Sequence, residues 1–103
     1  MDHYELRKLV SKKLKLIRVE SGFNQSQMAS ILGMSKKTLV QIEKERMIAN
    51  WTTTVAVCAL FPQTDTLNSA LEGRPGEIVS EMARSRVQDQ RLPFQSIKKI
   101  PLE

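Results

Sequence analysis

The sequence is poor in the residues from which most enzyme sites are built. Among 103 residues there is one histidine, His3, and one cysteine, Cys58, with no glycine-rich phosphate loop and no cluster of acidic residues at metal-ligand spacing. We therefore expect no catalytic residue, no metal and no cofactor. His3, isolated near the start of the chain, is expected to be an incidental polar residue, and Cys58 a buried hydrophobic one.

The single cysteine, the lack of long apolar runs and the few aromatic residues limit the compartment and the kind of partner that we expect. One cysteine cannot form a disulfide within the chain, which fits a reducing compartment. There is no apolar run of about 18 residues and no hydrophobic stretch near Met1, so the sequence predicts no membrane span and no signal peptide. Aromatic residues make up 5% of the chain, too few to favour a stacking platform for single strands. We expect a cytoplasmic protein.

Positive charge is present, and it is placed unevenly. Residues 1–50 hold ten Lys or Arg and five Asp or Glu, whereas residues 51–103 hold six of each. The formal net charge of +5 therefore belongs to the first half, which favours a polyanionic partner. A lysine-rich helix with a solvated face would give the same excess. Four lysines of the first expected helix can either form a solvated face or contact phosphate, and both interpretations stay open: Lys8, Lys12, Lys13 and Lys15.

Residues 24–44 carry the most specific local pattern. Asn24 is a good N-cap, and Gln27 can return a hydrogen bond to it, so a helix should begin at Gln25. Gly33 follows where a left-handed C-terminal cap is needed. Ser35 can then cap a second helix. The pattern predicts two short helices joined by a tight turn.

The second of these helices has two distinct faces. At about 100° per residue, Leu39 and Ile42 point inward, while Lys37, Gln41 and Lys44 form a stripe on the opposite side. Two helices, a glycine in the turn and a polar outer face are typical of a helix-turn-helix DNA reader.

The whole pattern resembles the helix-turn-helix domain of the Cro and phage-repressor type, a large family of bacterial and phage regulators. The resemblance covers roughly residues 14–61 and rests on eight residues of the two helices: Gln25, Ala29, Gly33, Ser35, Thr38, Leu39, Ile42 and Glu43. Arg18, seven residues before Gln25, strengthens it, because the resemblance implies that this arginine pairs with Glu43 as a structural ion pair.

The expected fold is all-α: a compact five-helix, repressor-like helix-turn-helix domain in residues 1–73, followed by a C-terminal extension in residues 74–103. The first helix is expected from a cap at Asp2 to about Glu20, the fourth from a cap at Asn50 to Phe61, and the fifth from Thr64 or Asp65 to a stop at Gly73.

The extension should contain a short helix and an extended arm. Pro75 can start a helix over residues 75–90, in which four apolar residues fall near one stripe: Ile78, Val79, Met82 and Val87. That stripe should dock on its own domain or on a second subunit. Prolines in residues 91–103 predict an arm, and Leu102-Glu103 carries no functional weight because it can be a vector remnant.

The chain departs from the family pattern after the second helix of the motif. Glu45 stands where the family usually has glycine, and Ala49 replaces a common proline. We therefore expect the recognition helix to run longer, from Ser35 to about Arg46.

Chemistry and resemblance together assign the expected DNA contacts. The N-terminal residues of a helix in the major groove reach base edges, which predicts five base readers: Ser35, Lys36, Lys37, Thr38 and Gln41. Lysine can donate to guanine, and glutamine can pair bidentately with adenine. Three residues are expected to bind phosphate: Asn24, Gln25 and Lys44. The resemblance implies the same role for Gln25.

The expected function is sequence-specific binding of double-stranded DNA by a homodimeric transcriptional regulator, a repressor, on a palindromic operator. One alternative is an antitoxin-like or anti-repressor protein whose C-terminal third binds another protein through residues 75–101. Another is a degenerate helix-turn-helix used only for protein contacts. It is suggested by Glu45 in place of the usual glycine and by Ala49 in place of the common proline. An enzyme is poorly supported.

Overall fold

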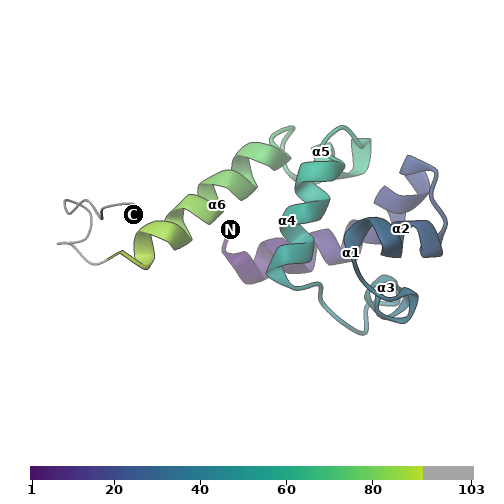
Figure 1. Cartoon of the computed structure of the whole chain (residues 1–103). Helices are drawn as coiled ribbons and strands as arrows, with labels where there is room; N and C mark the ends of the chain where they lie inside the picture. Colours follow the sequence, from purple (N-terminus) through teal and green to yellow (C-terminus); the bar gives the residue numbers. More distant parts are fainter. Residues whose placement is uncertain (92–103) are drawn as a thin grey trace, which may run out of the picture.

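The computed structural model describes residues 1–91, which fold into six α-helices with no strand among them. The helices are α1 (His3–Ser21), α2 (Gln25–Leu32), α3 (Lys36–Glu43), α4 (Trp51–Leu60), α5 (Asp65–Ala70) and α6 (Pro75–Asp89), arranged as in Figure 1. The all-helical prediction is confirmed. Within residues 1–91, none of the helices has the length and apolar character needed to cross a bilayer. The predicted extended arm lies outside the described residues, apart from Arg91.

Side-chain caps start five of the helices where the sequence predicts them. The capping residues are Asp2, Asn24, Ser35, Asn50 and Thr64, each accepting a hydrogen bond from the backbone N–H three residues later. At Asp2 and Asn24 the bond is reciprocal, because the side chains of Glu5 and Gln27 accept from the cap backbone. The helix starts are therefore set by local chemistry.

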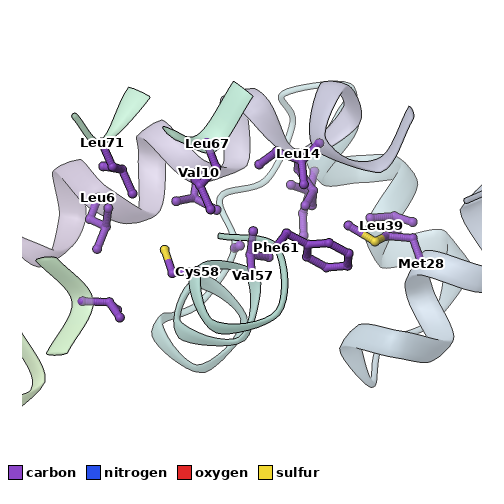
Figure 2. Close-up of a cluster of buried hydrophobic side chains, with 14 of the residues drawn as sticks. Leu6, Val10, Leu14, Met28, Leu39, Val57, Cys58, Phe61, Leu67 and Leu71 are labelled. Atoms are coloured by element: carbon purple, nitrogen blue, oxygen red, sulfur yellow. The ribbon is translucent and has the colours of Figure 1, made fainter. Parts of the chain in front are cut away.

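The core is built around α1. Four of its residues, at spacings of three and four, are fully buried: Leu6, Val10, Leu14 and Ile17. Helices α3, α4 and α5 all pack on α1. In Figure 2, Leu14 of α1 and Phe61 lie next to Met28 of α2 and Leu39 of α3. One continuous core thus holds α2 and α3 in place.

Helix α6 is only partly docked. Pro75 and Val79 are buried, and Ile78 and Met82 pack against the core. Val87, expected on the same stripe, is 52% exposed in the single chain, so it does not belong to the face of α6 that docks on the domain. The reason is the helical period: nine residues at about 100° each place Val87 opposite Ile78. The helix of the extension, Pro75–Asp89, matches the helix expected over residues 75–90 to within one residue.

Helix α3 ends at Glu43, so the expectation that the recognition helix continues to about Arg46 is wrong. Glu45 adopts a left-handed conformation with φ of 60°. The Arg46 N–H donates to Gln41 O and the Glu45 N–H to Ile42 O, both at 2.9 Å. This is a Schellman-type stop, in which glutamate tolerates the conformation usually left to glycine at a cost of about 1–2 kcal/mol.

The chain between α3 and α4 is tied to α1 at Ala49. The Ala49 N–H donates to Ser11 Oγ at 2.8 Å, and Arg7 Nε donates to Ala49 O, also at 2.8 Å. Ala49 itself is 2% exposed. A proline here has no N–H to donate, so alanine at this position suits a serine at position 11 of α1.

The end of α1 also holds the start of α5. The Glu20 carboxylate accepts hydrogen bonds from the Asp65 N–H, from the Thr66 N–H at 3.1 Å and from Thr66 Oγ1 at 3.0 Å. These bonds lower the pKa of Glu20, chiefly through the backbone N–H groups of Thr66 and Asp65. The ionised carboxylate therefore stabilises the folded state.

We expect Glu20→Gln to flatten the acid limb of the stability curve. Because the folded-state pKa of Glu20 is lowered, its contribution is complete above the ordinary carboxyl pKa of about 4.3 and is lost as the pH falls through the lowered value. Urea midpoints measured from about pH 6 to about pH 3 should fall less steeply for the variant than for the wild type. Glu72→Gln, an exposed carboxylate in the turn after α5, is the matched control. Parallel curves for the wild type and Glu20→Gln would contradict the assignment.

Candidate nucleic-acid interface

Helices α2 and α3 are joined by a three-residue turn whose geometry is closely determined. Gly33 ends α2 with φ of 70°, and the N–H groups of Gly33 and Met34 donate to Ser30 O and Ala29 O. Ser35 then caps α3. Both helix ends that adjoin the turn are therefore satisfied by hydrogen bonds within residues 29–38.

Helix α3 is docked by one face only. Leu39 is fully buried and Ile42 is 1% exposed, and this face packs on α1 and α2. The five predicted base readers lie on or just before the first turns of α3: Ser35, Lys36 and Lys37 are exposed, and Thr38 and Gln41 are partly exposed. The structure therefore places four of these residues on α3 and the fifth, Ser35, at its N-cap, and all five are at least partly exposed.

Two of these residues also hold the helix start together. Ser35 Oγ accepts from the Thr38 N–H at 3.1 Å and donates to Thr38 Oγ1 at 2.9 Å. Their hydroxyls thus fix each other's orientation. The longer side chains of Lys36, Lys37 and Gln41 carry the ammonium and amide groups that can reach outward from the helix.

Arg18 and Glu43, the two residues expected to pair, form a bidentate ion pair between α1 and the end of α3. Arg18 Nε lies 2.6 Å from Glu43 Oε2, and Arg18 Nη2 lies 3.1 Å from Glu43 Oε1. The side chains are 11% and 3% exposed. The hydrogen bonds to Glu43 raise the pKa of Arg18, so this guanidinium stays charged. Such a fork fixes distance and angle between two helices.

The ion pair also holds the start of α2, which the sequence alone did not predict. Gln25 Nε2 donates to Glu43 Oε1 at 3.2 Å, and Arg18 Nη1 donates to the Phe23 carbonyl at 2.9 Å. One buried carboxylate therefore connects α1, α2 and α3. The start of α2 is held next to the end of α3, where the exposed Lys44 follows Glu43.

The three predicted phosphate contacts are distributed around this network. Asn24 is the exposed cap of α2, with its side-chain oxygen accepting from the Gln27 N–H at 2.8 Å. Gln25 is partly exposed, and Lys44 is exposed as the C-cap of α3. The unpaired N–H groups of the first turn of α2 add a partial positive charge at Asn24 and Gln25.

Two lysines of α1 lie beside the turn that ends α3. Lys8 and Lys12, one helical turn apart and both exposed, line a recess with Glu45, Met47 and Ile48. Their ammonium groups add positive charge next to the loop between α3 and α4. Of the four α1 lysines whose role was left open, these two line that recess.

The groups that enzymes commonly use are engaged in packing. Cys58 is fully buried, and burial raises the pKa of its thiol to about 11. His3 is not incidental, contrary to expectation: its ring stacks on Trp51 at 4.4 Å between centroids, and Arg86 Nη1 lies 2.8 Å from its Nδ1. In residues 1–91, no three His, Cys, Asp or Glu side chains are grouped as metal ligands.

Comparisons of the chain with protein-family models, with curated proteins and with solved structures found no match. The function is therefore inferred from the residues, the geometry and the charge described above.

Proposed function

We propose that this protein is a sequence-specific regulator that binds double-stranded DNA through a repressor-like helix-turn-helix domain in residues 1–73. Helix α3 is the recognition helix. The observation that carries the proposal is its one-sided docking: Leu39 and Ile42 are buried, while Lys36, Lys37 and Gln41 lie on a polar surface beside them. The likeness to the Cro and phage-repressor pattern supports the same reading.

The dimensions of α3 suit the major groove. An α-helix with its side chains is about 10–12 Å in diameter, and the groove is about 12 Å wide, so α3 can enter it. The groove reader must be held rigidly, because base edges are distinguished by hydrogen-bond donors and acceptors a few ångströms apart. The Arg18–Glu43 fork and the caps at Gly33 and Ser35 supply that rigidity.

Phosphate contacts would position α3 in the groove. Gln25 and the N-terminus of α2 offer amide and backbone N–H donors to one phosphate, and Lys44 offers a charge near the same end of α3. Gln25 is already oriented by Glu43, so its amide is held near the proposed phosphate. The excess of positive charge in residues 1–50 attracts the duplex over a longer range.

The operator of such a protein is palindromic when two copies bind together. Two-fold symmetry of a homodimer requires half-sites about 34–36 Å apart, one turn of B-DNA. A regulator of this type acts as a repressor by occupying its site.

An antitoxin-like or anti-repressor function is the second candidate. It is favoured by the projection of the second half of α6 from the domain, which offers a helix to another protein (Figure 1). Residues 92–101 of the proposed partner segment lie outside the described residues. Co-purification of a second polypeptide that is lost on truncation after residue 73 would favour this function.

The proposed function is tested by a salt-dependent mobility shift on the DNA upstream of the protein's own gene. We expect a discrete shift at low salt, with log affinity falling by about 0.9 per phosphate contact for each unit of log salt. Lys37→Glu should abolish the shift, because it places a negative charge on the surface of α3. Arg74→Glu, an equal charge change in the exposed turn before α6, should leave it intact. Absence of any binding by the wild type at low salt would exclude the proposal.

A further inference from the structure

Among the described residues, the second half of α6 buries no side chain, and Arg86 links it to Trp51 and His3. Residues 84–91 are exposed without exception, although the helix continues to Asp89. In Figure 1 this part of α6 runs away from the other five helices. Isolated helical segments shorter than about 12 residues are marginal in water, because each turn needs tertiary packing to offset its entropy cost. A surface that covers this helix would supply that packing.

An apolar recess lies along this exposed half. It is lined by Trp51 at the start of α4 and by five residues of α6: Ala83, Arg86, Val87, Gln90 and Arg91. Val87 is 52% exposed at its edge, and Trp51 is only partly buried. A valine beside a half-covered tryptophan is the kind of pair that a partner surface buries.

The wall of the recess is already ordered in the single chain. The Arg86 guanidinium carbon lies 5.9 Å from the centre of the Trp51 ring, and Arg86 also contacts the His3 ring. The His3 ring in turn stacks on the Trp51 ring. These three side chains come from α1, α4 and α6. Because they restrain one another, a docking partner does not have to order Trp51 or Arg86 on binding.

The charges along α6 identify the partner. Glu77 and Glu81 lie on its first half, Arg84, Arg86 and Asp89 lie on its second half, and Arg91 follows its C-terminal cap. The first half therefore has a net negative charge and the second half a net positive charge. Two copies of α6 side by side in the same direction would oppose like charges, whereas an antiparallel pair opposes acids to arginines. The helix is therefore complementary to an inverted copy of itself, the condition that a two-fold symmetric interface requires.

We propose that a second copy of this chain docks on the recess, with the two α6 helices antiparallel and Val87 of each chain seated against Trp51 and Ala83 of the other. The proposal rests on the homodimer of the proposed function and assigns its interface. Helix α5 is left outside that interface.

Sedimentation equilibrium of the full chain tests the interface. We expect the wild type to dimerise and Val87→Glu to raise the dimer dissociation constant at least about tenfold, because a buried anchor is replaced by a charge. Val19→Glu, at an apolar residue of α1 that is 58% exposed, is the matched control and should dimerise like the wild type. Equal dimerisation of the two variants would overturn the proposal, as would a wild type that stays monomeric at about 100 µM.

Charge reversal gives a second measurement that folding defects cannot imitate. Glu77→Arg and Arg91→Glu should each weaken dimerisation, and the double variant should recover most of the loss because opposite charges again face each other. Failure of the double variant to recover would contradict the antiparallel arrangement.

The outcomes separate this interface from the proposed function. A wild type that dimerises through Val87 and binds no DNA keeps the interface and removes the regulator. A wild type that shifts DNA but sediments as a monomer keeps the DNA-binding function and excludes the interface.

Discussion

Replacing Arg18 with methionine is expected to lower the free energy of unfolding by about 3–5 kcal/mol. Methionine keeps the apolar length of the side chain but leaves the Glu43 carboxylate, 3% exposed, with Gln25 as its remaining side-chain partner. A buried carboxylate that has lost its counter-ion is costly, because the desolvation of its charge is no longer offset. The change also removes the donor to the Phe23 carbonyl.

Urea unfolding followed by helical circular dichroism measures this loss, and a double variant identifies its cause. Arg18→Met with Glu43→Met removes both charges, so most of the stability lost in Arg18→Met alone should return. Lys15→Met, at an exposed residue of the same helix, is the matched control and should change stability by about 0.5 kcal/mol or less. A double variant no more stable than Arg18→Met would show that the pair is not the source of the effect.

The helix starts were predictable because each depends on a few neighbouring residues. A cap such as Asn24 or Asn50 satisfies backbone N–H groups within three positions of itself, so the signal and its effect lie in the same short stretch. The α1 stripe was predictable for the same reason, since burial at spacings of three and four is a property of one helix. Leu6, Val10 and Leu14 needed no knowledge of their partners.

The end of α3 was not predictable from the residue at its stop. Glu45 has a side chain that normally disfavours φ of 60°, and the expectation of a longer helix followed from that preference. The outcome is decided elsewhere: Ala49 is held by Ser11 and Arg7 of α1, so the chain must leave α3 early enough to reach them. Contacts that span 38 and 42 residues carry no local signature in the sequence.

In the candidate site, too, some features were predictable from the sequence and others were not. Lys37, Gln41 and Lys44 could be placed on one outer face from the helical period alone. The bond from Gln25 to Glu43 could not, because it joins residues of different helices and depends on how α2 meets α3. His3 illustrates the limit most clearly. A lone terminal histidine has no pattern around it, yet it connects the start of the chain to α4 and α6.

The connection between the ion pair and the proposed recognition helix α3 has a functional consequence. Arg18, Gln25 and Glu43 form one hydrogen-bonded unit, so the residue proposed to clamp phosphate is oriented by the residue that fixes α3. Rigid positioning of a donor lowers the entropy cost of the contact it makes. Loss of Arg18 should therefore weaken DNA binding even at temperatures where the variant remains folded.

Base reading and phosphate binding are separated by two single substitutions on α3. Gln41→Ala is expected to cost about 1–3 kcal/mol on the proper operator and to relax specificity at one base pair, because its amide can pair bidentately with adenine. Lys44→Ala should weaken binding to all sequences alike and reduce the salt slope by about 0.9, because an ammonium on a phosphate releases one counter-ion. Titrations of both variants on operator and on random DNA, at several salt concentrations, measure the two effects. If both variants lost affinity equally on random DNA, Gln41 would be a phosphate contact and the major-groove assignment of this face of α3 would fail.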